Sequence, residues 1–67
     1  MVLKNLFNVI APSEIIMLRD YHNDKEYFYG KRKECPYLYF TYDVELVMSF
    51  VNCKGENYLL IQVWDGE

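Results

Sequence analysis

The residues best suited to chemistry gather in the middle of the chain. Six of the seven tyrosines lie between Asp20 and Tyr42, interleaved with His22, Lys25 and the basic run 31–33. A tyrosine ring packs well in a half-buried position while its hydroxyl meets water or a partner. Nucleobases stack on such rings beside phosphate-binding Arg and Lys, and the same residue types dominate protein–protein hot spots. The segment therefore predicts a contact surface.

Three interpretations of this cluster stay open at this point. The rings form the edge of a small core, they contact a protein, or they contact a small nucleotide whose phosphate the basic residues hold. Under the second and third interpretations, the predicted binding residues are Tyr27, Tyr29, Arg32, Lys33, Tyr37 and Tyr39.

Catalytic and metal chemistry find little support in the sequence. Nucleophilic catalysis would need Cys35 or Cys53 to be activated by His22, yet no local motif surrounds either thiol. The acidic residues of the middle segment stand beside Lys and Arg, as solvated ion pairs do. Two cysteines this far apart, with a single His in the chain, lack the short ligand spacing of zinc sites. We expect no enzyme, no cofactor and no metal.

Length and charge restrict the partners. With 67 residues the chain forms one domain, 1–67, whose core is small. The net charge is −3, and residues 35–67 carry five acidic groups against one lysine, which argues against a long nucleic acid. No apolar run is long enough for a membrane span, and the start of the chain does not resemble a signal peptide. We expect a cytoplasmic protein with reduced thiols and no membrane partner.

The first element expected is a short amphipathic helix. Leu3, Leu6, Phe7 and Ile10 recur with helical spacing, and Pro12 ends the helix soon afterwards. A helix this short is not stable alone, so its apolar side must dock on the rest of the domain.

Four strands follow, at 14–20, 26–33, 44–53 and 57–64, with turns at 22–25 and 54–56. The period of two puts Tyr27 and Tyr29 on one face of their strand, with a bulge or bend expected at Gly30. In the third strand Val44 is expected to share a face with Leu46. Alternation in the last strand puts residues 59, 61 and 63 on one face, and segment 35–43 is expected to be irregular.

The fold class is therefore α+β: a small four-stranded antiparallel β-meander of two hairpins, open or curled into a half-barrel, with a short N-terminal helix. Both faces of this sheet carry hydrophobic residues, and one short helix cannot cover the second face. The uncovered face predicts contact with a partner or with another copy of the chain, as a homo-oligomer.

The order of these patterns resembles a known group of proteins. It runs from Leu3-x-x-Leu6-x-x-Val9-Ile10 through residues 14–20, then 27–30 (Tyr-x-x-Gly), 44–47 (Val-x-x-Val) and 58–63. This arrangement is similar to that of short uncharacterised proteins carried by phages and prophages of Firmicutes, and the similarity spans nearly the whole chain.

The resemblance implies a mobile-element setting, in which small proteins often inhibit host defences by binding a nuclease or by sequestering a nucleotide signal. Our hypothesis is a non-enzymatic binding protein of a phage or mobile element, acting in the cytoplasm of a bacterial host on a host protein or a small nucleotide. The alternative is a homo-oligomeric structural or accessory module without a ligand.

Overall fold

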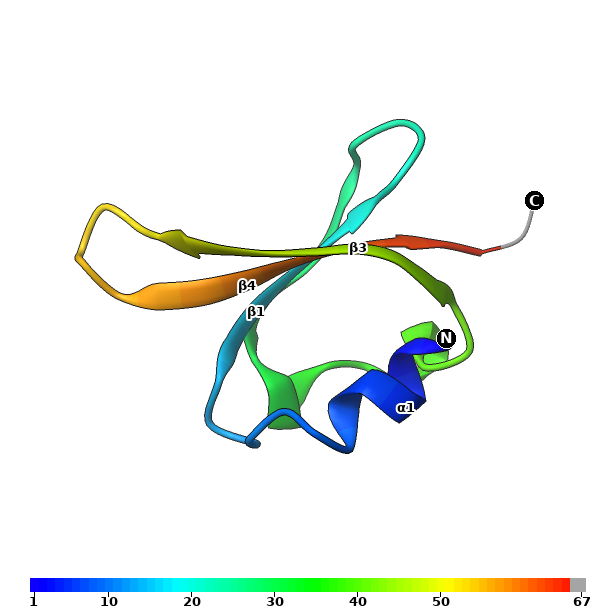
Figure 1. Cartoon of the computed structure of the whole chain (residues 1–67), viewed down its shortest axis with the longest axis horizontal. Helices are drawn as coiled ribbons and strands as arrows, with labels where there is room; N and C mark the ends of the chain where they lie inside the picture. Colours follow the sequence, from blue (N-terminus) through cyan, green and yellow to red (C-terminus); the bar gives the residue numbers. More distant parts are fainter. Residues whose placement is uncertain (66–67) are drawn as a thin grey trace.

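A four-stranded sheet curves over a short helix (Figure 1). The structure is a computed structural model that describes residues 1–65. The sequence also predicts a polar tail at 65–67, and the last two of these residues lie outside the described part. The elements in chain order are α1 (Leu3–Phe7), β1 (Ile15–Asp20), β2 (Glu26–Lys31), 3₁₀ turns at Arg32–Glu34 and Tyr37–Tyr39, β3 (Asp43–Val51) and β4 (Asn57–Trp64).

The sheet is mixed, and its strand order is β2-β1-β4-β3. Both predicted hairpins, β1 with β2 and β3 with β4, are antiparallel. However, β1 and β4 lie side by side and parallel, so the prediction of a purely antiparallel meander is wrong. A meander would have put β2 beside β3, which are the two most exposed strands. Instead, the strands with fully buried side chains occupy the centre, which removes the most apolar surface from water.

One face of the sheet, the inner face, is closed by α1 and by the connection 32–42. The buried hydrophobic side chains are Leu3, Phe7, Ile10, Ile16, Leu18, Cys35, Ile61 and Val63. The Leu3 N–H donates to the Tyr42 carbonyl at 2.9 Å, which fastens the helix to the connection. The predicted helix is thus confirmed, although it ends at Phe7, and Ile10 reaches the core from the following turn.

A bulge in β3 changes which residues share a face. Val44 pairs with Val63 on the inner face, whereas Leu46 pairs with Gln62 on the opposite, outer face, because the register shifts between Val44 and Leu46. The prediction that Val44 and Leu46 share a face is therefore wrong. Residues 59, 61 and 63 of β4 do alternate as predicted, and Ile61 and Val63 are fully buried.

A second bulge lies in β2, where Leu18 pairs with Phe28 and the next residue, Arg19, pairs with Glu26. Tyr27 is therefore the extra residue of β2. Tyr27 packs against the core, while Tyr29 pairs with Met17 on the outer face, so the prediction that the two rings share a face is also wrong. The sequence predicted a bulge or bend at Gly30 instead. There, a Cβ would lie 3.1 Å from the tip of the Phe28 ring, so glycine provides room for that ring.

The turns and the connection agree better with the sequence. In the β3–β4 turn, the Asn52 side-chain oxygen accepts the N–H groups of Lys54 and Glu56, and Gly55 adopts a φ of 82°. A side-chain acceptor and a glycine with positive φ are typical of such turns. Segment 35–43, which was expected to be irregular, contains one 3₁₀ turn, Tyr37–Tyr39. The other 3₁₀ turn is formed by residues 32–34, which were expected to extend the second strand.

Candidate functional site

Five of the six predicted binding residues fall into three places, and the sixth, Tyr37, lies apart from them. The first is a tyrosine cluster at the margin of the inner face. Tyr27 stacks on Tyr39 with ring centroids 5.2 Å apart, and Tyr42 meets both rings edge-on at 5.8 and 5.5 Å. The Tyr39 hydroxyl donates to the Tyr27 carbonyl at 3.4 Å. These rings pack on the core and on one another, so they fit the core-edge interpretation best.

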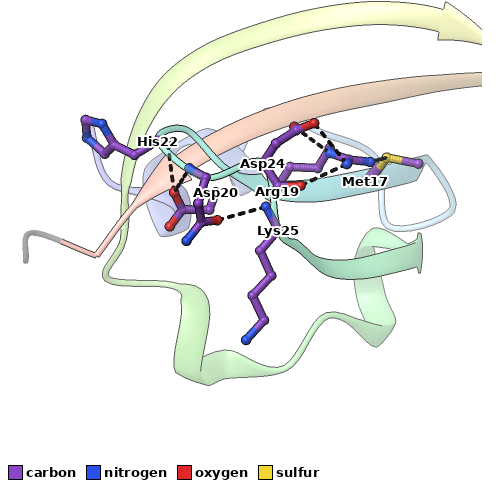
Figure 2. A network of polar contacts seen from close by, with 7 residues as sticks. Met17, Arg19, Asp20, His22, Asp24 and Lys25 are labelled. Atoms are coloured by element: carbon purple, nitrogen blue, oxygen red, sulfur yellow. Dashed lines mark hydrogen bonds and ion pairs between the residues drawn. The ribbon is translucent and has the colours of Figure 1, made fainter.

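Asp20 anchors this cluster at the end of β1. Its side chain is only 6% exposed, and its Oδ2 accepts the Tyr27 hydroxyl at 2.8 Å. Its Oδ1 accepts the backbone N–H groups of His22 and Asn23 at 2.7 and 2.9 Å (Figure 2). These hydrogen bonds hold the pKa of Asp20 below its ordinary value, and the bond from the Asn23 backbone N–H has the largest effect. The hydrogen bond between the Tyr27 hydroxyl and Asp20 raises the pKa of Tyr27 to about 12, because ionised Asp20 disfavours a tyrosinate beside it.

The β1–β2 turn beyond Asp20 is held by a second set of polar contacts. The Arg19 guanidinium donates to both carboxylate oxygens of Asp24, at 2.8 and 3.1 Å, and to its carbonyl at 2.8 Å (Figure 2). Asp24 has a φ of 61°, which an aspartate tolerates better than most residues. These contacts fix the turn, and they leave Asp20 and Asp24 with partners that explain their presence without catalysis.

The second place holds the basic residues of the prediction. The Arg32 guanidinium lies 5.7 Å from the centre of the Phe7 ring, and its backbone N–H donates to the Glu14 carbonyl. The Lys33 N–H donates to the Pro12 carbonyl. The Arg32 guanidinium thus lies over the Phe7 ring of α1 in a cation–π arrangement. Tyr37 lies apart on the connection and is 84% exposed.

The third place is the outer face of the sheet, where Tyr29 is the sole predicted binding residue. We define the outer face by the side chains Met17, Tyr29, Leu46, Met48, Phe50, Tyr58, Leu60 and Trp64, which the strand register puts on one side. Tyr29 and Phe50 both approach the Tyr58 ring, with centroids 5.8 and 5.9 Å apart. Within residues 1–65, α1 and the connection 32–42 lie on the other side of the sheet (Figure 1), and the His22 ring of the β1–β2 turn contacts Trp64.

Exposure distinguishes the outer face from an ordinary surface. Tyr29, Leu46, Met48 and Phe50 are 43, 40, 42 and 39% exposed, although they are contiguous and apolar or aromatic. Exposed apolar surface of this kind, when contiguous, marks interaction sites. The sequence predicted that a second face would stay uncovered, and the structure shows it uncovered. It did not predict the roles of Phe50, Met48 and Tyr58, although their alternation in two adjacent strands was visible.

A cleft of about 340 Å³ opens at the hairpin end of the outer face. Its lining residues are Ile15, Tyr29, Gly30, Lys31, Glu34, Asn52, Cys53, Lys54 and Glu56. The Asn52 side-chain amide donates to the Tyr29 hydroxyl at 3.2 Å across it. The lining contains two lysines and two glutamates, so the cleft offers no net positive charge to a phosphate. Arg32 and Lys33, which the nucleotide interpretation requires, do not line it.

The remaining groups with chemical potential lie apart from one another. Cys35 is buried, and burial raises the pKa of its thiol to about 11, while Cys53 is exposed in the β3–β4 turn; both are free thiols. The His22 ring packs edge-on against Tyr21 and Trp64. Among residues 1–65, no three His, Cys, Asp or Glu side chains are grouped so that they could hold a metal ion.

No family model, curated protein or solved structure matches this chain. In the described part of the chain, no helix has the length and apolar character needed to cross a membrane.

Proposed function

We propose that this chain is a non-enzymatic binding module that contacts a protein partner through the outer face of its sheet. The observation that carries the proposal is the uncovered apolar and aromatic surface centred on Tyr58, beside the partly exposed Tyr29 and Phe50. Rigid aromatic side chains of this kind supply the largest share of binding energy at protein interfaces. The sheet fixes their positions, so little conformational entropy is lost when a partner binds.

A protein partner fits this surface better than a small nucleotide. Binding a phosphate calls for charge-assisted hydrogen bonds from Arg or Lys. In the cleft beside Tyr29, Lys31 and Lys54 are offset by Glu34 and Glu56. Arg32 is engaged with Phe7 beneath the sheet, away from the outer face. The nucleotide interpretation therefore lacks a net positive charge beside Tyr29, whereas an apolar protein surface needs none.

The biological setting rests on the resemblance to phage and prophage proteins. In that setting, the module would act in a bacterial host and occupy a surface of a host protein, such as a component of its defence. The proposed activity is inhibition by occupation, because a chain of this size blocks a surface without needing chemistry of its own.

The proposal is tested by affinity capture from a lysate of a Firmicutes host, with immobilised wild type, Tyr29→Ala, Tyr58→Ala and Tyr37→Ala. Tyr37 is the matched control, because it is the most exposed tyrosine and lies on the connection, off the outer face. We expect a protein retained by wild type and Tyr37→Ala but lost from the two outer-face variants. Retention that is equal for all four proteins, or lost only with Tyr37→Ala, would contradict the proposal.

The alternative is a homo-oligomeric module without any other ligand, and the same uncovered face favours it. The two functions differ in what covers the outer face. If wild type retains no protein while sedimentation shows that Tyr29→Ala and Tyr58→Ala dissociate an oligomer, the outer face binds another copy of the chain, and the structural role replaces the inhibitory one.

A further inference from the structure

The two edges of the sheet differ in how they are protected against pairing with another chain. β2 carries a bulge at Tyr27 and a charged residue at each end, Glu26 and Lys31. β3, at the other edge, is the longest strand, and its stretch from Leu46 to Val51 contains no charge, proline or glycine. Natural proteins blunt exposed edge strands with such charges, prolines or bulges. The unprotected stretch of β3 is therefore available for pairing.

The backbone direction along this stretch follows from the turn that closes the hairpin. The Asn52 N–H donates to the Glu56 carbonyl at 2.9 Å, so the main-chain groups of Asn52 face the β4 side. Along an antiparallel strand, successive residues direct these groups to alternate sides. The N–H and C=O groups of Val51, Ser49 and Val47 consequently point away from β4, toward the free edge.

The chain itself limits how far this edge extends. The Val44 N–H donates outward to the Met1 carbonyl at 2.7 Å, and Val2 forms an antiparallel bridge with Asp43. The start of the chain therefore covers the edge at Asp43 and Val44. A strand that pairs with β3 must fit beyond this block.

One antiparallel register of a second copy satisfies both conditions. If Ser49 lies opposite Ser49 of the second copy, Val47 lies opposite Val51, and all three outward-facing residues of each copy are hydrogen-bonded. Asn52 of the second copy then lies opposite Leu46. The second copy turns away at this residue, so it does not reach the position beside Val44 that Met1 occupies. A shift by two residues toward Val44 would put Asn52 of the second copy where Met1 lies.

The side chains agree with this register. Val47 and Val51, which are 43 and 62% exposed in the single chain, become cross-strand neighbours on the inner side. Met48 lies opposite Phe50 of the second copy on the outer side, where both are exposed. Apolar and aromatic pairs of this kind stabilise adjacent strands, and no two like charges oppose each other within the paired stretch.

We propose that two copies of this chain pair antiparallel along β3, on a two-fold axis at Ser49, into one continuous sheet made of the four strands of each copy. The outer faces of the two copies then lie on the same side of the joined sheet. The inference stands apart from the proposed function, because it concerns the free edge of β3 and is tested on the purified chain alone.

The first test removes the backbone N–H of Ser49, the residue on the two-fold axis. Ser49→Pro removes a donor that faces the second copy and makes no bond to β4, and proline is tolerated at such edge positions. Light scattering at tens of micromolar should give twice the chain mass for wild type and for the control Ser49→Ala, and the single-chain mass for Ser49→Pro, with unchanged circular dichroism. A monomeric wild type, or a Ser49→Pro variant that is folded and still dimeric, would overturn the proposal.

A second test decides the matter if Ser49→Pro fails to fold. In a Cys53→Ser background, Ser49→Cys puts two thiols on the axis, where opposed residues are about 5.5 Å apart between Cα atoms, within the range a disulfide spans. We expect a covalent dimer under mild oxidation. The matched control Val47→Cys should stay single, because its opposite residue is at position 51. Absence of the Ser49→Cys dimer, or equal cross-linking of both variants, would refute the register.

Discussion

Asp20 joins the tyrosine cluster to the β1–β2 turn, because its carboxylate accepts the Tyr27 hydroxyl and two backbone N–H groups of the turn. Its pKa is lowered in the folded chain, so the ionised side chain stabilises the fold above the ordinary carboxyl pKa, and this contribution disappears as the pH falls through the folded value. We predict that Asp20→Asn melts earlier than wild type at neutral pH and loses less stability than wild type on acidification. Thermal melts across a pH series test this.

The control for Asp20 is Asp24→Asn. Asp24 is also bonded by its carboxylate, but the side chain is 68% exposed, and exposed ion pairs contribute little. We expect its acid dependence to follow that of wild type. If Asp20→Asn lost as much stability as wild type between neutral and acid pH, the carboxylate would not have the stabilising role assigned to it.

The two thiols should react at very different rates in the folded chain. Cys53 is exposed in a turn, whereas Cys35 is 8% exposed and burial raises its pKa to about 11. Because the thiolate is the reactive form, we predict fast alkylation of Cys53 and protection of Cys35 at neutral pH. Intact mass spectrometry with time would show one adduct that forms quickly and a second that forms only on unfolding. Two adducts at equal rates would contradict the burial of Cys35.

At the scale of single residues, the sequence identified the tyrosine cluster but could not divide it. Tyr27 and Tyr29 are two positions apart, so a period of two gives them the same side of the strand. One extra residue in a bulge puts the two rings on opposite faces of the sheet, and no sequence pattern predicted a bulge at this position. The division into a core-edge cluster and an outer-face ring therefore had to come from the strand register.

At the scale of elements, the β3–β4 turn depends on backbone conformation more than on packing. Gly55 has a φ of 82°, and a Cβ added there would meet no atom within 4 Å. We predict that Gly55→Ala costs about 1 kcal/mol, a purely conformational effect, and lowers the melting temperature by several degrees. Gly30→Ala should also destabilise, through contact with the Phe28 ring at 3.1 Å.

A second substitution separates the two causes. Trimming the ring with Phe28→Leu should relieve part of the cost of Gly30→Ala, since the clash is with that ring, and should leave the cost of Gly55→Ala unchanged. Denaturant unfolding of the single and double variants measures both couplings. A coupling between Gly55 and Phe28 as large as that between Gly30 and Phe28 would contradict this assignment.

The elements themselves were largely predictable, while their order in the sheet was not. The alternation from Asn57 to Trp64 and the turn residues around Gly55 give one hairpin, and those around Asp24 give the other. Two hairpins can, however, join along either of their strands. The choice of a parallel β1–β4 contact depends on burial in three dimensions and on the route of residues 32–42, whose short 3₁₀ turns have no periodicity to read.

At the scale of the whole molecule, the two faces of the sheet differ in how far they are covered. The inner face is closed by α1 and by the connection, and its buried side chains hold the fold together. The outer face keeps its aromatic and apolar side chains exposed, and the free edge of β3 adjoins it. We therefore propose that the inner face provides stability and the outer face provides binding.

The most direct test compares Tyr27→Ala with Tyr29→Ala, since these neighbouring tyrosines lie on opposite faces. For each variant, thermal melting gives stability, and calorimetry gives the affinity for the protein captured by wild type. Tyr27→Ala should lose about 2–3 kcal/mol of stability, because its ring packs on the core and bonds Asp20. Tyr29→Ala should lose about 2 kcal/mol of binding and about 1 kcal/mol or less of stability. A Tyr29→Ala variant that binds as wild type does, or whose lost binding merely follows its lost stability, would contradict the assignment of binding to the outer face.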